Sequence, residues 1–164
     1  MIVVADTSPL NYVVQLGLVS EFHAIYGEVV VPQAVHRELL HPGSPLLVQL
    51  WAASLPEWIE VKQASVFDAT LPSHLGIGER EAISLAIELN AAMLIVDDLA
   101  GRKAVKARRI PVTGTLTFLW QAALLSRLDF EAKLEELNKL GFRASESVLE
   151  GVRQAFKARR QSTS

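Results

Sequence analysis

Short apolar segments rich in β-branched residues alternate with helical patterns along most of the chain. The clearest are Ile2–Ala5 and Met93–Val96, and an aspartate follows each of them. Segments of this length without a polar face are typical of strands that are covered on both sides, as in a parallel sheet. The alternation therefore predicts an α/β fold, a three-layer sandwich in which helices cover both faces of a mainly parallel sheet of about four to five strands.

The expected elements extend over the whole sequence. Strands are expected at 2–5, 28–31, 58–61, 93–96 and 110–112. Helices are expected from Pro9 to near Gly17 and at 19–26, 32–40, 44–54, 79–89, 99–108, 115–125, 130–140 and 145–159, whereas 62–77 has no regular pattern. Because 164 residues suffice for one core, we expect a single domain over 1–164, with a core of 1–125 and a helical C-terminal extension of 126–160.

The composition excludes several kinds of site. The chain has no cysteine, which rules out disulfides, thiol nucleophiles and thiolate zinc sites. Its four histidines form no paired ligand motif, so a hard ion with oxygen ligands, Mg²⁺ or Mn²⁺, is favoured over zinc. The apolar N-terminus is interrupted by Asp6 and has no preceding lysine or arginine, which is typical of neither a signal peptide nor a membrane span. We therefore expect a cytoplasmic protein without a membrane segment.

Six acidic residues stand at strand ends or near helix edges. They are Asp6, Glu38, Glu79, Glu81, Asp97 and Asp98. Parallel strands end at one edge of the sheet, where ligands bind in open α/β folds, so Asp6 and Asp97 are expected to reach a shared cation. Successive strand residues point to opposite faces, so one of Asp97 and Asp98 is expected to face the pocket and the other to support it.

These acids also have structural interpretations. An aspartate after a strand often stabilises a turn, and acids in the first turn of a helix offset its dipole. Glu81 follows Gly78 by three residues, as a capping glutamate does. Glu79 and Glu81 lie about 200° apart around a helix, so both cannot face one ion squarely. Glu38 taken alone is an ordinary exposed helix acid.

Cations gather in other parts of the sequence. The net charge is −2, yet residues 102–109 hold five cations and the tail adds Arg153, Lys157, Arg159 and Arg160. A basic run is often only a solvated helix face, but it is also the pattern of a surface that meets a polyanion.

Four segments together make the chain resemble the PIN domain family. They are Asp6–Leu10, Val31–Leu39, Gly78–Ile83 and Ile95–Asp98, and the resemblance covers residues 1–125. The order of four acids carries it, because no single motif is sufficient. The GExEAI form of the third segment, followed by a basic helix and Thr113–Leu116, is similar to a PIN-like subgroup whose members are mostly uncharacterised.

The resemblance implies a metal-dependent endoribonuclease that cleaves single-stranded RNA. The family pattern falls on Asp6, Glu38, Glu79 and Asp97 as catalytic and metal-binding acids, with Mg²⁺ or Mn²⁺ as cofactor. Glu79 stands where the family usually has an aspartate, which puts the metal geometry in question. Supporting or alternative positions fall on Thr7, Ser8, Glu81, Asp98 and Thr115, and the expected contacts of the RNA backbone are Arg102, Lys103 and Lys106. A toxin role with an antitoxin partner, and a homodimer, are further expectations from the family.

Two other functions remain compatible with the sequence. A PIN-like module could bind RNA or a protein without cleaving, which the glutamate at the third site favours. A phosphatase with an aspartate nucleophile also uses an acid after the first strand, but its usual pattern needs a second aspartate where this chain has Ser8. A nucleotide-binding Rossmann domain would need a GxGxxG motif after a strand, and the chain has none.

Overall fold

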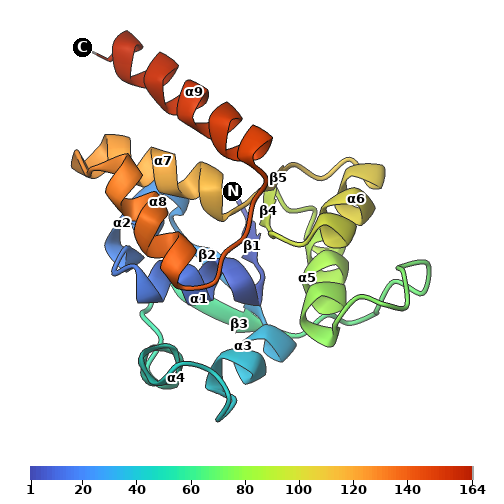
Figure 1. Cartoon of the computed structure of the whole chain (residues 1–164). Helices are drawn as coiled ribbons and strands as arrows, with labels where there is room; N and C mark the ends of the chain where they lie inside the picture. Colours follow the sequence, from blue (N-terminus) through green and yellow to red (C-terminus); the bar gives the residue numbers. More distant parts are fainter. Residues whose placement is uncertain (164) are drawn as a thin grey trace.

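A parallel sheet forms the centre of the protein in the computed structural model, which describes residues 1–163 (Figure 1). Across the sheet, its strands are β3 (Ile59–Lys62), β2 (Val29–Pro32), β1 (Val3–Ala5), β4 (Met93–Ile95) and β5 (Val112–Thr113). Every neighbouring pair is parallel, so the carboxyl ends of all these strands lie along one edge. The predicted parallel sheet is confirmed, with β5 as an edge strand.

Helices connect the strands and also form the C-terminal part of the chain. Within residues 1–163 they are α1 (Thr7–Gln15), α2 (Val19–Tyr26), α3 (Gln33–Leu40), α4 (Leu46–Ala53), α5 (Ile77–Glu88), α6 (Leu99–Ala107), α7 (Thr115–Ser126), α8 (Phe130–Lys139) and α9 (Glu146–Ser162).

Each face of the sheet has its own apolar core. Side chains alternate along β1, so Val3 and Ala5 join the core beneath α1, α2 and α7, whereas Val4 joins the core beneath α5 and α6. Figure 1 shows α5 and α6 on one side of the sheet and α1, α2, α7 and α8 on the other. This arrangement confirms the predicted three-layer sandwich.

Several element boundaries differ from the prediction by one to three residues, among them those of α1, α5 and β5. Helix α1 begins at Thr7 rather than at Pro9, because a proline is tolerated in the first turn, where N–H groups have no partner within the helix. Helix α5 begins at Ile77, so Glu79 lies inside its first turn. Strand β5 begins at Val112, two residues later than expected, because the chain first leaves α6 through Arg109, which has a positive φ of 59°.

The C-terminal helices pack beside α7. Phe130 of α8 stacks on Phe156 of α9, with the ring centroids 4.6 Å apart. Leu149 and Val152 also pack partly against the first core, yet none of the residues of α9 is buried. The helix extends away from the body of the protein (Figure 1). Among the described residues, each helix is too short or too polar to cross a lipid bilayer.

Candidate active site

The ends of β1 and β4 bring two of the predicted aspartates together. Ala5 pairs with Ile95 in the sheet, and the N–H group of Asp6 donates a hydrogen bond of 2.9 Å to the Ile95 carbonyl. Asp97 follows β4 after one further residue, so it lies at the same edge as Asp6. The parallel pairing that the apolar runs predict is therefore the physical reason for this proximity.

Asp6 is the most perturbed acid of this edge. Only 5% of its surface is exposed, and its Oδ1 atom has no hydrogen-bond partner. Burial raises the pKa of Asp6 from 3.8 to about 7; the N–H group of Thr7 opposes the shift, and the charges of Glu79, Glu38 and Asp97 add to it. The charges of the other three acids of the predicted site therefore all act on Asp6.

Glu79 also has an oxygen without a partner. It extends from the first turn of α5, and its buried Oε2 atom makes no hydrogen bond. Burial raises the pKa of Glu79, and the charge of Asp98 raises it further. A Cβ atom at Gly101 would lie 3.4 Å from Oε2, so the absence of a side chain there leaves room for this carboxylate beside α6.

Asp97 is held by the start of α7. The N–H group of Thr115 donates to Asp97 Oδ1 at 2.8 Å, and the Thr115 hydroxyl donates to Oδ2. Burial raises the pKa of Asp97, whereas the bonds from Thr115 and the charge of Arg102 lower it. A Cβ atom at Gly114 would lie 2.7 Å from Asp97 Oδ1 and 2.8 Å from Arg102 Nη1, so only glycine fits at this position without a shift.

Glu38 reaches the site from the last part of α3, although its residue is exposed. The hydroxyl of Thr7 donates to Oε2, and the N–H group of Gly78 donates to Oε1 at 3.1 Å. A Cβ atom at Gly78 would lie 2.8 Å from Oε2. The carboxylate of Glu38 therefore lies directly on the N-terminal turn of α5, next to Glu79.

The two alternative acids have structural partners. Glu81 is 2% exposed and accepts hydrogen bonds from the N–H groups of Ala34, at 2.7 Å, and Ala64, at 3.0 Å. The spacing of Glu81 from Gly78 predicts that it caps its own helix, but α5 begins earlier. The side chain instead accepts from the first turn of α3. Asp98 caps α6 by accepting from Ala100 and Gly101.

The other predicted residues divide into three groups. Thr7 and Thr115 hold Glu38 and Asp97, whereas Ser8 is exposed in the first turn of α1. Arg102 lies beside Asp97, and Lys103 lines a cavity with Glu79 and Asp98. Lys106 is exposed one turn further along α6.

The sequence did not reveal that Tyr12 lies near Asp97 and contacts the connection between α8 and α9. Burial and the charge of Asp97 raise the pKa of Tyr12, and the charge of Arg143 opposes that shift. The ring of Tyr12 meets Phe142 edge to face, at 5.4 Å between centroids. These residues come from α1 and from the α8–α9 connection, and no local pattern joins two segments so far apart in the sequence.

The donor set fits a hard divalent cation. The site offers only carboxylate and hydroxyl oxygens, and two of the buried carboxylate oxygens have no partner. Like charges in a buried site repel one another, and a cation would relieve both the repulsion and the unmet hydrogen-bonding capacity. Within residues 1–163, no three acidic or histidine side chains are already arranged as a finished metal site.

Comparisons with known proteins bear on the fold and the family of the chain. No curated protein matches the chain. The fold is similar to that of a PilT N-terminus domain protein, SSO1118, from the hyperthermophilic archaeon Sulfolobus solfataricus P2, with a TM-score of 0.52 and 19% identity over 74% of this chain and 93% of that one. Residues 2–158 match the model of a family described as DUF3368: PIN domain. Since that match spans nearly the whole chain, the protein belongs to the PIN domain family, whose fold is of the nuclease type.

Proposed function

We propose that the protein is a metal-dependent nuclease that hydrolyses single-stranded RNA, with Asp6, Glu38, Glu79 and Asp97 holding Mg²⁺ or Mn²⁺. The observation that carries the proposal is the buried, partnerless Oδ1 atom of Asp6, whose carboxyl has a pKa of about 7 among the other acids. A carboxyl left in this state lowers stability unless a ligand meets it. Perturbed acids at the edge of an α/β sheet are also the usual mark of a reactive site.

The chain itself orients the acids. Thr115 fixes both oxygens of Asp97, and Thr7 with the N–H group of Gly78 fixes Glu38. When bound, the cation would supply the positive charge that offsets the phosphate and the leaving oxygen. Cation binding requires the deprotonated form of Asp6, so the apparent affinity should rise between pH 6 and 8 as this carboxyl loses its proton.

Basic side chains on α6 supply a contact surface for the phosphate backbone. Arg102 lies beside Asp97, and Lys103 lies in the cavity that Glu79 also lines. Contacts of this type bind RNA without regard to sequence and weaken as salt is added. Lys106, which is exposed on the same helix, would extend the surface.

The test is cleavage of labelled single-stranded RNA in Mn²⁺, in Mg²⁺ and in EDTA. Asp6→Asn keeps the shape of the side chain and removes its charge, so cleavage should fall at least a hundredfold, while exposed Glu57→Gln should match wild type. Equal cleavage by wild type and Asp6→Asn would show that these acids do not form the active site. Cleavage that persists in EDTA would show that the reaction does not need a metal ion.

A binding module that does not cleave is the second candidate. It is favoured because no three acids are arranged as a finished metal site among the described residues. Under this alternative, wild type and Asp6→Asn would both bind RNA with a steep dependence on salt, and neither would cut it. The toxin role, the antitoxin partner and the homodimer remain predictions from the resemblance, and the cytoplasmic location remains a prediction from the sequence.

A further inference from the structure

The irregular segment 63–76 lies between β3 and α5 and will be called the strap. Hydrogen bonds hold it against α5. Its first part is held by side chains of α5 that accept hydrogen bonds from strap N–H groups. The pairs are Ala64 with Glu81 (3.0 Å), Ser65 with Glu88 (2.9 Å) and Asp68 with Ser84 (3.0 Å). Positions 81, 84 and 88 share one face of the helix, so the first part of the strap lies against about two turns of α5.

The second part of the strap is held by its apolar residues. Leu71 and Leu75 are buried in the core that α5 and α6 share. The strap is therefore a positioned wall, despite its lack of regular secondary structure.

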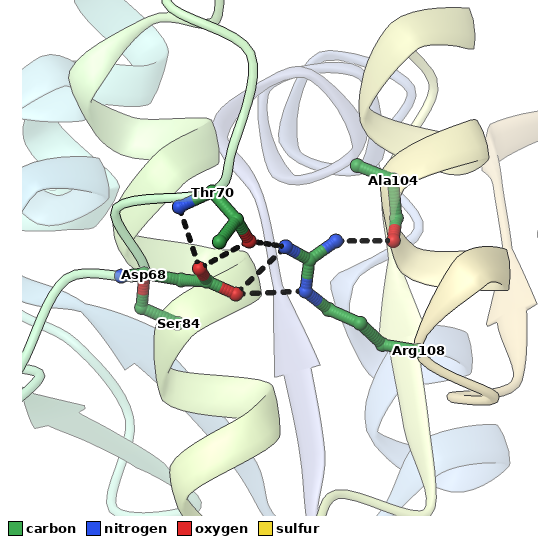
Figure 2. A network of polar contacts seen from close by, with 5 residues as sticks. All are labelled: Asp68, Thr70, Ser84, Ala104 and Arg108. Atoms are coloured by element: carbon green, nitrogen blue, oxygen red, sulfur yellow. Dashed lines mark hydrogen bonds and ion pairs between the residues drawn. The ribbon is translucent and has the colours of Figure 1, made fainter.

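An ion pair joins the middle of the strap to the end of α6 (Figure 2). Two nitrogens of Arg108, Nε and Nη2, donate to Asp68 Oδ2 at 2.8 and 2.7 Å. The N–H group and hydroxyl of Thr70 donate to Asp68 Oδ1 at 2.8 and 2.6 Å, and Arg108 Nη1 donates to the Ala104 carbonyl at 3.0 Å. We call this pair, Asp68 with Arg108, the clasp; it fixes the separation of the strap from α6.

A cavity of about 690 Å³ lies between the strap and α6. His74 and Leu75 line it from the strap, and Leu99 and Lys103 line it from α6. Glu79 and Asp98 complete the lining, so the cavity opens directly onto the acidic edge. The walls thus combine the ring of His74, apolar leucine side chains and the cation of Lys103. They lie next to Glu79, whose Oε2 atom has no hydrogen-bond partner.

We propose that this cavity binds the nucleotide adjacent to the phosphate that is cleaved. Lys103 contacts the backbone phosphate, and His74 with Leu99 packs against the base. The clasp is a positioning pair that sets the width of the site. The inference rests on the proposed function, because a nucleotide next to the acidic edge is a substrate only if that edge hydrolyses phosphodiesters. A ring and an apolar side chain accept every base, so the site should show little sequence preference.

Binding of a labelled single-stranded RNA of about ten nucleotides in EDTA tests the contacts without turnover. His74→Ala should raise Kd about fivefold, and His74→Phe should restore it within about twofold, because stacking needs only a ring. Lys103→Ala should raise Kd and lower the salt slope by about one. Lys139→Ala removes an exposed cation of α8 and should leave Kd unchanged. Equal effects at Lys103 and Lys139, or no effect at His74, would overturn the site.

The clasp is tested by whether Asp68→Asn raises or lowers the Kd for RNA. If Asp68 acted on RNA only through its negative charge, Asp68→Asn would tighten RNA binding. Because Asp68 instead holds the strap, we expect Asp68→Asn to raise Kd, and Arg108→Ala to do the same. Because both substitutions break the ion pair between Asp68 and Arg108, the loss of affinity in the double variant should be smaller than the sum of the two single losses. Additive losses, or tighter binding by Asp68→Asn, would overturn the clasp; thermal melts confirm that each variant is folded.

The two proposals fail in distinguishable ways. If wild type cuts RNA in Mn²⁺ and the His74 and Lys103 variants keep its KM, hydrolysis stands and the nucleotide site falls. If wild type does not cut but these variants weaken RNA binding, the nucleotide site stands as a binding site and hydrolysis falls. If wild type neither binds nor cuts, both fall. The expected result is a raised KM with kcat within about twofold of wild type.

Discussion

Asp6 and Asp68 are the same kind of residue in opposite surroundings. Asp6 lies at the sheet edge with one oxygen unpartnered, and its pKa is raised to about 7, chiefly by burial. Asp68 lies in the clasp, and its pKa is lowered to about 2 by the hydroxyl of Thr70, by Arg108 and by the N–H group of Thr70. The protein satisfies the charge of one carboxylate and leaves that of the other unmet. An unmet charge costs stability, and this cost is the reason for proposing the acidic edge as a ligand site.

The largest effect concerns the stability of the metal-free protein above pH 4. The folded pKa of Asp6 lies above its ordinary value of 3.8, so the folded state keeps a proton that the unfolded chain releases. The stabilisation is therefore present at low pH and lost as the pH rises toward 7, by up to about 4 kcal/mol at 1.4 kcal/mol for each pK unit. Urea unfolding in EDTA at pH 5 and pH 8 measures the part of this loss that falls above pH 5, about 3 kcal/mol.

Asp6→Asn provides the contrast for that measurement. The amide carries no charge, so the variant should keep its stability at pH 8 and exceed wild type there. A variant with the same loss between pH 5 and pH 8 as wild type would show that Asp6 is not the source.

A second effect separates Glu81 from the acids of the site. Glu81→Ala would leave the N–H groups of Ala34 and Ala64 buried without acceptors, so it should destabilise the protein by about 3 kcal/mol. Urea unfolding checks the value. Glu88→Ala removes one exposed bond to Ser65 and should cost much less. A stabilising Glu81→Ala would group Glu81 with Asp6 instead.

Gly114→Ala is expected to impair catalysis more than folding. The new Cβ atom would displace Asp97 and Arg102, and cleavage in Mn²⁺ should fall about tenfold or more. Gly151→Ala is the matched control, because a Cβ atom there meets nothing within 4 Å in the middle of α9, and it should stabilise the helix by about 0.5–1 kcal/mol. Equal cleavage by both variants would contradict the close packing at Gly114.

The smallest expected effect is the decrease in the free energy of unfolding that Asp68 causes at acid pH. Asp68 has a folded pKa below its ordinary value of 3.8, so its contribution is present above pH 4 and is lost as the pH falls toward 2. Asp68→Asn should therefore be less stable than wild type at pH 5 and differ little from it at pH 2. Its slope is opposite in sign to that of Asp6. A difference that persists unchanged at pH 2 would show that the charge of Asp68 does not stabilise the fold.

The local pattern of apolar residues was enough to predict the parallel sheet and the two aspartates at the carboxyl ends of its strands. The β-branched runs before Asp6 and Asp97 indicated parallel strands, and parallel strands must end together. Element ends were less predictable, because Pro9 fits either the start of a helix or its first turn. Spacing alone also misassigned Glu81, whose partners Ala34 and Ala64 lie in other segments of the chain.

The strap shows where sequence reasoning ends. Residues 62–77 have no period, so neither their contacts with α5 nor the pairing of Asp68 with Arg108 follows from the sequence. Composition and periodicity were enough to predict the α/β class and the strand-end aspartates, because these depend on residue type and near neighbours. The partners of each carboxylate depend on packing between distant segments, and only the folded chain shows which acids have their charge satisfied and which remain open to a ligand.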